Sequence, residues 1–206
     1  MLGLKKVTDD MKTHKNPALR SGPAPFKPPT AAKPVAAAKP AAVSKPVSKP
    51  PLVELQGKKW VVEYLTDNTS TLIEDTNNKQ TVYIYKCVNS TIQVKGKINS
   101  IILDNCKKTA VVFEDAISMV EFVNCQSVKC QVLNKVPTVS IEKTDGCQVY
   151  LSKDSLDTSF ISAKSSEMNV VIPNADGDFT EYAIAEQFKS VFNGKTFTTE
   201  VNDIAA

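Results

Sequence analysis

Apolar residues recur at a fixed interval of 19 along the middle of this chain. Aligning every nineteenth residue gives four apolar columns: Val82, Ile101, Val120 and Val139; Ile84, Leu103, Phe122 and Ile141; Ile92, Val111, Cys130 and Val149; and Val94, Phe113, Val132 and Leu151. A fifth column contains Cys87, Cys106 and Cys125, and Thr144 continues it. A fixed period near 20 residues indicates a solenoid, because each repeat must cover the apolar face of its neighbour.

Within each repeat the apolar residues alternate with other residues, as in Val82-x-Ile84. Alternation with β-branched residues predicts strands, whereas a helix would repeat every three or four residues. A leucine-rich repeat is excluded, because the chain lacks its regular Leu/Asn consensus and its helical return arm. Polar pairs such as Asn89-Ser90, Lys107-Lys108 and Asp145-Gly146 suit the corners between short strands. We therefore predict an all-β parallel β-helix in which equivalent residues stack about 4.8 Å apart.

Weaker matches extend the columns in both directions. They are Asn68 and Ile73 before the regular repeats, and Phe160, Ala163, Met168 and Val170 after them. The chain therefore has room for about six coils, which stack into a rod roughly 25–30 Å long.

Composition divides the chain into regions with different physical properties. Residues 1–51 contain ten of the twelve prolines and carry a formal charge of +8, whereas residues 52–206 carry −5. The Pro/Ala/Lys-rich segment 21–51 has too few large apolar residues to offset the entropy of ordering, so we expect a disordered linker that favours polyproline II. Residues 52–177 form the predicted β-helix, and residues 178–206 leave the 19-residue period.

The cysteines and the hydropathy pattern favour a cytoplasmic location. An odd number of cysteines, five, placed mostly in one column, indicates buried, reduced thiols. We expect no metal site, because there is no Cys-x-x-Cys and the one histidine, His14, lies in the basic tail. No stretch approaches the roughly 20 apolar residues of a membrane span, so we expect no membrane insertion. No signal peptide is recognisable ahead of the tail.

The chain opens with Leu4, Lys5, Lys6 and Val7. Taken alone, these four residues favour a solvated basic tail. The motif also resembles the Leu-Lys-Lys-Thr/Val core of the Wiskott–Aldrich-homology actin-binding motif, which would make residues 1–20 a partial actin-binding motif. Such an extended segment, with apolar anchors and point charges, binds by folding onto its partner.

Longer blocks resemble the C-terminal half of the cyclase-associated protein family, and the resemblance covers essentially the whole chain. The blocks include Lys5–Met11, Thr13–Arg20, Gly57–Trp60, Tyr83–Asn89, Lys95–Ser100, Lys143–Cys147 and Ala163–Asn169. This resemblance implies a right-handed parallel β-helix associated with the cytoskeleton. It also implies binding to monomeric ADP-actin, alone or with cofilin bound, and faster nucleotide exchange on that actin. No cofactor is implied.

Six lysines near coil corners are candidates for a basic ridge that contacts actin, an acidic protein. They are Lys86, Lys95, Lys97, Lys107, Lys108 and Lys129. The alternative interpretation is a solvated face whose charges prevent edge-to-edge pairing. Nucleic acid is not favoured as a partner, because the domain is acidic and no aromatic residues interleave with these lysines.

The residues of the predicted domain do not indicate catalysis. No carboxylate cluster recurs across adjacent coils, as a polysaccharide lyase or hydrolase groove would require. The domain has no histidine for a Ser/His/Asp set, and no arginine for a GTPase-activating finger. A carbohydrate-active enzyme therefore ranks below a binding protein. The other alternative is a cytosolic scaffold that recruits partners through the proline-rich linker.

The C-terminal segment contains the candidate dimerisation residues. Asn193-Gly194 is a type I′ hairpin signal, and Thr196–Val201 has the composition of a returning strand. Phe188, Val191 and Phe192 fit either a strand or one helical turn. A solenoid end must be capped, and a hairpin can cap its own rod or exchange onto another. The family resemblance implies exchange, which gives a homodimer through Phe188, Phe192, Asn193, Gly194, Phe197 and Val201.

Overall fold

The computed structural model describes residues 49–202. Almost all of the predicted linker, and the whole of the predicted N-terminal motif, lie outside these residues. The described residues form fourteen strands and one short 3-10 helix. The strands are β1 (Leu52–Gln56), β2 (Lys59–Glu63), β3 (Thr71–Ile73), β4 (Thr81–Tyr85), β5 (Thr91–Asp104), β6 (Ala110–Val123), β7 (Gln126–Lys135), β8 (Thr138–Glu142), β9 (Asp145–Tyr150), β10 (Ser159–Ala163), β11 (Ser166–Pro173), β12 (Phe179–Ala183), β13 (Phe188–Phe192) and β14 (Phe197–Val201), and the helix is η3 (Lys153–Ser155).

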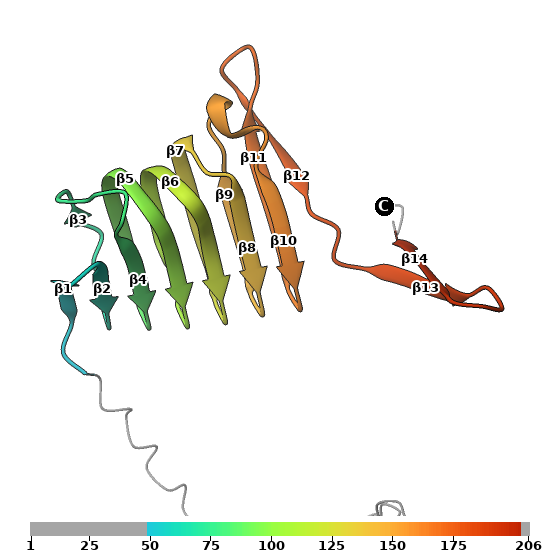
Figure 1. Ribbon diagram of the computed structural model, residues 1–206, viewed down its shortest axis with the longest axis horizontal. Coiled ribbons are helices and arrows are strands. Elements are labelled where there is room, and N and C mark those ends of the chain that lie inside the picture. The colour runs from blue at the N-terminus through green and yellow to red at the C-terminus, as the bar shows by residue number, and fades with distance from the viewer. Residues whose placement is uncertain (1–48, 203–206) are drawn as a thin grey trace, which may run out of the picture. The chain divides into compact units, whose positions relative to one another are not determined.

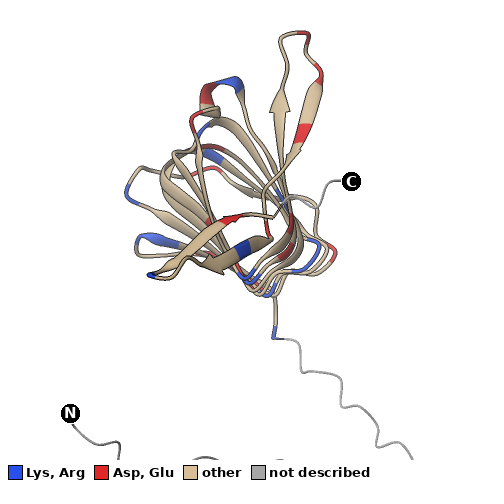
Figure 2. Ribbon diagram, turned by 90° about the vertical axis from the view of Figure 1, so that its right-hand side faces the viewer, with Lys and Arg blue, Asp and Glu red and all other residues tan. Residues whose placement is uncertain are grey.

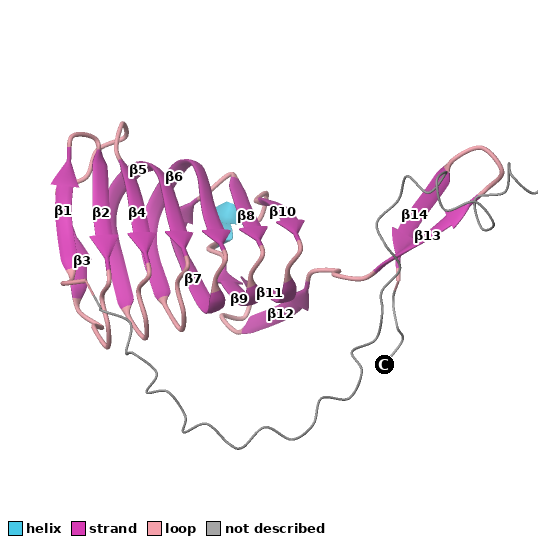
Figure 3. Ribbon diagram, turned by 90° about the horizontal axis from the view of Figure 1, so that it is seen from below, coloured by secondary structure: helices cyan, strands magenta, loops and turns pink. Residues whose placement is uncertain are grey.

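The chain winds as a parallel β-solenoid, which confirms the predicted fold class (Figure 1). On one face, β2, β4, the end of β5, the end of β6, β8 and β10 pair in parallel. On the other face, β3, the start of β5, the start of β6, β7, β9 and β11 do the same. The long strands β5 and β6 belong to both faces, which joins the two into one 12-stranded sheet (Figure 3). We call the first the tyrosine face, because it carries Tyr83 and Tyr85. We call the second the neutral face, because its outward residues include Gln93 and Gln131.

The strand register reproduces the predicted columns. Val82 pairs with Ile101, Ile101 with Val120, and Val120 with Val139. Ile92, Val111, Cys130 and Val149 are matched in the same way on the neutral face. Every residue of both columns is fully buried. The burial of apolar side chains stacked at equivalent positions of successive coils therefore stabilises the rod, as expected of a solenoid.

The period lengthens in the first and last coils. Val149 pairs with Val170 and Ile73 with Val94, so these coils contain two residues more than the regular repeat on the neutral face. On the tyrosine face Val62 pairs with Ile84, so the first coil is three residues longer there. The extra residues lie in the loop from Glu74 to Gln80 and in the region of η3, outside the stacked strands. This placement explains why the columns weaken in the sequence at both ends while the stacking continues in space.

One corner of each coil is built from two residues in the left-handed backbone conformation, separated by two others. The first position of the corner is occupied by Tyr64, Lys86, Asn105, Asn124, Lys143 and Lys164, and the fourth by Asp67, Asn89, Lys108, Ser127, Gly146 and Glu167. All twelve have φ between 48° and 77°. The strain of this conformation is offset by hydrogen bonds between coils, such as Lys86 N–H to Asp104 C=O at 3.0 Å and Asn105 N–H to Val123 C=O at 2.9 Å. We call this structure the left-handed corner.

The second position of the left-handed corner points inward and holds the predicted cysteine column. The Cys106 thiol donates to the carbonyls of Ile84 and Asp104, at 3.5 Å each. Thr144 occupies the same position two coils further on and donates to the carbonyl of Glu142 at 3.1 Å. All five cysteines are buried and free, as predicted. The column therefore supplies small side chains that donate hydrogen bonds to buried carbonyls, which is why Thr can replace Cys there.

A second bend passes through Lys95, Gly96 and Lys97, where the ladder between β5 and β6 shifts register. Gly96 has φ of +78°, and a Cβ atom there would lie 2.6 Å from Thr76 Oγ1. Glycine is therefore required on two grounds, backbone conformation and space.

The C-terminal segment divides into two parts. β12 pairs antiparallel with β11 and so belongs to the large sheet. β13 and β14 form a separate hairpin that pairs with no strand of the solenoid. Phe188, Val191 and Phe192 therefore lie on a strand, not on a helical turn.

The hairpin loop differs from the predicted two-residue type I′ turn. Phe192 pairs with Phe197, so the loop contains four residues, 193–196. Asn193 Oδ1 accepts the backbone N–H groups of Lys195 and Thr196, both at 3.0 Å. The prediction was wrong because this side chain closes an Asx turn, which leaves only Gly194 with positive φ.

Candidate partner-binding surfaces

The six lysines predicted as one ridge lie in three places. Lys86, Lys107 and Lys108 share the left-handed corner, in successive coils, and Figure 2 shows lysine-bearing segments recurring at one corner of the stacked coils. Lys95 and Lys97 flank Gly96 at the second bend, and Lys129 lies on β7 of the neutral face. Sequence position near a corner could not distinguish these sites, because one coil contains more than one bend.

The lysines also differ in their charge environment. Lys95 Nζ lies 2.6 Å from Glu74 Oε1, and this hydrogen-bonded ion pair raises the pKa of Lys95 above its ordinary value. Among residues 49–202, no carboxylate lies within ion-pair distance of Lys86, Lys107 or Lys108. Only the lysines of the left-handed corner therefore combine proximity to one another with uncompensated charge.

A group of tyrosines lies beside this corner and was missed in the sequence. The Tyr64 and Tyr85 rings meet edge to face with centroids 5.8 Å apart, and those of Tyr83 and Tyr85 stack at 5.9 Å. Lys86 Nζ lies 5.1 Å from the Tyr85 ring centroid, and Lys59 Nζ 4.3 Å from that of Tyr83. The alternation of Tyr83 and Tyr85 with buried Val82 and Ile84 is the signal that could have revealed them.

A hydrogen bond fixes one of these rings. Tyr83 donates its hydroxyl to Asp104 Oδ2 at 2.8 Å. Partial burial, followed by this bond to a carboxylate, raises the pKa of Tyr83 well above its ordinary value, so the donor stays protonated. The Tyr85 hydroxyl in turn raises the pKa of exposed Lys86. At neutral pH the surface therefore presents held aromatic rings and lysine cations.

The predicted dimerisation residues gather on one face of the β13–β14 hairpin. Phe188 pairs with Val201 and Phe192 with Phe197, and because side chains alternate along a strand these four share a face. Phe188 is 58% exposed and Phe197 67% exposed. Asn193 and Gly194 lie in the loop beyond the strands. The face is an apolar surface of the kind that marks a contact site.

The last coil of the solenoid leaves a strand edge unpaired. β10 pairs with β8 alone, and Ile161 on β10 is 58% exposed. A cavity of about 370 Å³ opens beside it, lined by Ser162, Lys164, Ser165, Ser166, Met168, Ala185, Glu186 and Phe188. An unpaired, apolar strand edge is a template for strand addition.

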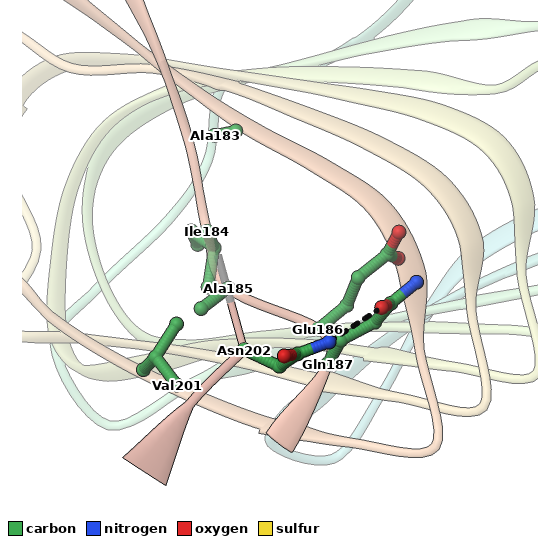
Figure 4. A pocket seen from close by; sticks show the side chains of 7 residues that line it. All are labelled: Ala183, Ile184, Ala185, Glu186, Gln187, Val201 and Asn202. Carbon is green, nitrogen blue, oxygen red and sulfur yellow. Dashed lines mark hydrogen bonds between the residues drawn. The ribbon is translucent and has the colours of Figure 1, made fainter. Parts of the chain in front are cut away.

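A second cavity, of about 280 Å³, lies where the chain passes between β12 and the hairpin (Figure 4). Ala183–Gln187 lines one side, and Val201 and Asn202 line the other. Asn202 Nδ2 donates to Gln187 Oε1 at 3.4 Å across it. This contact closes the base of the hairpin, so the strands emerge from the connecting segment as one unit.

Two kinds of site are not found among residues 49–202. No group of three His, Cys, Asp or Glu side chains is arranged to hold a metal ion in this part of the chain. No helix in the same range is long and apolar enough to cross a membrane.

Comparison with known proteins identifies relatives of this fold. Residues 49–204 match the family described as "Adenylate cyclase associated (CAP) C terminal". The chain is 57% identical to human adenylyl cyclase-associated protein 1, and 49% identical to human adenylyl cyclase-associated protein 2. Each match covers 98% or more of this chain but only 43% and 42% of the relative, so the chain spans less than half the length of these relatives.

A solved structure agrees with this assignment. The crystal structure of cyclase-associated protein from Cryptosporidium parvum superimposes with a TM-score of 0.72 at 34% identity, covering 75% of this chain and 96% of the other. That structure is itself of a cyclase-associated protein, in agreement with the family match over residues 49–204. The chain belongs to the cyclase-associated protein family and contains its C-terminal β-solenoid domain.

Proposed function

We propose that this protein binds actin monomers and promotes the exchange of their bound nucleotide, returning ADP-actin to the polymerisable pool. The observation that carries this proposal is the family match over residues 49–204, joined to a rigid rod with uncompensated lysines at one corner. Actin is acidic, so a basic, preorganised surface suits it as a partner. The proposed place of action is the cytoplasm, in association with the cytoskeleton.

Faster exchange requires a preference between two conformations of actin. A binder accelerates nucleotide release only if it binds the open-cleft conformation more tightly than the closed one. A β-solenoid suits this role because its backbone is hydrogen-bonded from coil to coil and changes shape little on binding. Binding energy is then available to shift the equilibrium of actin.

We further propose that the chain forms a homodimer by exchange of the β13–β14 hairpin. The exposed apolar face of the hairpin and the unpaired edge of β10 support this arrangement. Exchange would cover both surfaces at once, and each rod of the dimer would carry one copy of the actin-binding surface. Two copies on one particle increase avidity without any new contact.

The direct test is a nucleotide-exchange assay on ADP-actin with a fluorescent ATP analogue. We expect the chain to accelerate uptake of the analogue in proportion to its concentration, up to saturation. A matched arm with cofilin-bound ADP-actin measures whether the chain also acts on that complex. Absence of acceleration on both forms of actin would reject the exchange activity, and absence of binding in a native-gel titration would reject the actin partner.

A further inference from the structure

We infer that one compact surface, made of Tyr64, Tyr85, Lys86, Lys107 and Lys108, is the contact that this domain makes with the acidic face of the actin monomer. We call it the tyrosine–lysine patch. The inference rests on the proposed function and goes beyond it, because it selects one surface among the faces of the rod and adds two tyrosines to the binding residues.

The charges of the patch are free to meet a partner. Lys86, Lys107 and Lys108 are exposed and lie within two adjacent coils of the left-handed corner. Their neighbours in the corner of the next coil are Asn124, Gln126 and Ser127, which are neutral hydrogen-bonding residues.

Two carboxylates of this region are both engaged: Asp67 accepts from Asn89 Nδ2, and Asp104 accepts from the Tyr83 hydroxyl. Neither lies within ion-pair distance of the three lysines. A cluster of lysines that are not ion-paired interacts favourably with an acidic protein surface and speeds the encounter with it.

Further along the rod, the left-handed corner is no longer positively charged. Lys143 Nζ lies 3.7 Å from Glu142 Oε1, and Asp145 and Glu167 occupy corner positions in the last two coils. Lysines there are interspersed with carboxylates, which lowers the local potential. The basic surface is therefore confined to the coils next to the tyrosines.

The tyrosines provide rigid, amphipathic anchors. Tyr64 precedes Lys86 in the first position of the corner, and its backbone N–H donates to Tyr85 C=O at 3.0 Å. The ring contacts at 5.8 Å and 5.9 Å hold both side chains before any partner arrives. Tyrosine is enriched among residues that dominate binding energy, because it offers a large contact area at small entropic cost.

The other faces of the rod lack this combination. On the tyrosine face, beyond Tyr83, the outward residues of successive coils include Asp104, Glu121 and Glu142, which would repel an acidic partner. The outward residues of the neutral face include Gln93, Gln131 and Gln148. Lys129 lies on β7 outside the left-handed corner, and its strand partners there, Ala110 and Gln148, are neutral, so it serves as a control position.

The test measures actin affinity of the intact chain and of four variants by native-gel titration or fluorescence anisotropy. We expect Tyr85→Ala to weaken binding at least tenfold, and Lys107→Glu with Lys108→Glu to weaken it at least tenfold at low salt. Tyr85→Phe keeps the ring and should stay within threefold of the natural chain. Lys129→Glu reverses one lysine outside the patch, which is half the charge change of the double variant, and should also stay within threefold.

The dependence of affinity on salt separates the contribution of the lysine charges from that of the Tyr85 ring. The effect of the lysine reversal should shrink as ionic strength rises, whereas that of Tyr85→Ala should persist, because only the former is screened. Circular dichroism and light scattering on each variant verify that fold and oligomeric state are retained. Should Tyr85→Ala disturb the fold, the lysine reversal at exposed positions decides the question alone.

The outcomes are distinguishable. Loss of affinity in the patch variants with retention in Tyr85→Phe and Lys129→Glu supports the assignment. Binding that survives the patch substitutions, or falls equally with Lys129→Glu, overturns the patch and leaves the actin partner standing. A natural chain that fails to bind actin at all overturns the proposed function, and the assignment with it.

Discussion

The middle coils and the C-terminal hairpin have similar strand sequences but opposite burial. In both, large apolar residues share one face of a strand, as Val111 and Phe113 do in β6 and Phe188 and Phe192 do in β13. Phe113 is fully buried between neighbouring coils, whereas every residue of β13 and β14 is exposed. Alternation therefore specifies a strand with one apolar face, but what covers that face depends on whether the next coil of the same chain is there to do so.

The largest effect should come from emptying one position of the core. Phe113→Ala removes a side chain stacked between Val94 and Val132, and we expect a loss of about 3–5 kcal/mol of unfolding free energy. Urea unfolding measures it. The matched hairpin variant, Phe197→Ala, should cost far less within a single chain. Equal losses would contradict the contrast drawn between the two regions.

The hairpin should instead respond in the association of two chains. Replacing Phe192 and Phe197 by Ser removes two aromatic anchors from its apolar face, and we expect the dimer to weaken by about 2 kcal/mol or more, roughly 30-fold in the dissociation constant. Sedimentation equilibrium measures this. Thr198→Ala, on the opposite face of β14, is the control. A natural chain that is monomeric at all accessible concentrations would exclude strand exchange.

A further effect should appear at alkaline pH, only in the core, and over a single pH unit it is smaller than the two effects above. Burial raises the pKa of Cys147 from 9.0 to about 12. A thiol whose pKa is raised by folding stabilises the native state fully below pH 9, and that contribution is lost as pH rises towards 12. The expected slope is about 1.4 kcal/mol per pH unit for one such thiol.

Unfolding titrations of Cys147→Ser against the natural chain between pH 9 and pH 12 isolate this contribution. The variant should show a shallower decline over the interval. The hairpin contains no cysteine, so deleting residues 188–206 should leave the slope unchanged. A slope that depends on the hairpin would place the titrating group elsewhere.

The smallest effect should come from surface ion pairs in either region. Glu74→Gln removes the partner of Lys95, and Glu200→Gln that of Lys189 in the hairpin, where Nζ and Oε1 are 3.8 Å apart. Both pairs are exposed, so we expect losses below about 1 kcal/mol that shrink with salt. Thermal unfolding at low and high ionic strength measures them. A larger loss at Glu74 would show that the loop 74–80 does more than extend the first coil.

The sequence was most informative where each repeat has the same length. The columns through Val82 and Ile92 follow directly from the period, because equivalent residues meet the same neighbours. The left-handed corner was only partly visible. Glycine marks it at Gly146, but Lys86, Asn105 and Lys108 adopt the same conformation, and lysine gives no local signal for it. Hydrogen bonds to the next coil, not residue preference, hold these positions.

The candidate binding surface was harder to predict than the fold. Placing Lys86 beside Lys107 requires knowing which bend each one occupies, and placing Tyr64 beside Tyr85 requires the longer first coil. Tyr64 and Lys86 are 22 residues apart, so a strict period of 19 does not align them. Compensation of Lys95 by Glu74 also depends on that longer coil, because the loop 74–80 brings the carboxylate to the bend.

The left-handed corner also sets how the molecule could change length. Each corner is bonded only to those directly before and after it, as in the series Val88 N–H to Leu65 C=O, Lys107 N–H to Cys87 C=O and Gln126 N–H to Cys106 C=O. Excising one complete winding would therefore rejoin matching partners and shorten the spacing between the tyrosine–lysine patch and the hairpin by one strand width, about 4.8 Å. The number of coils thus sets the distance between the tyrosine–lysine patch and the hairpin that contacts the second copy of the chain.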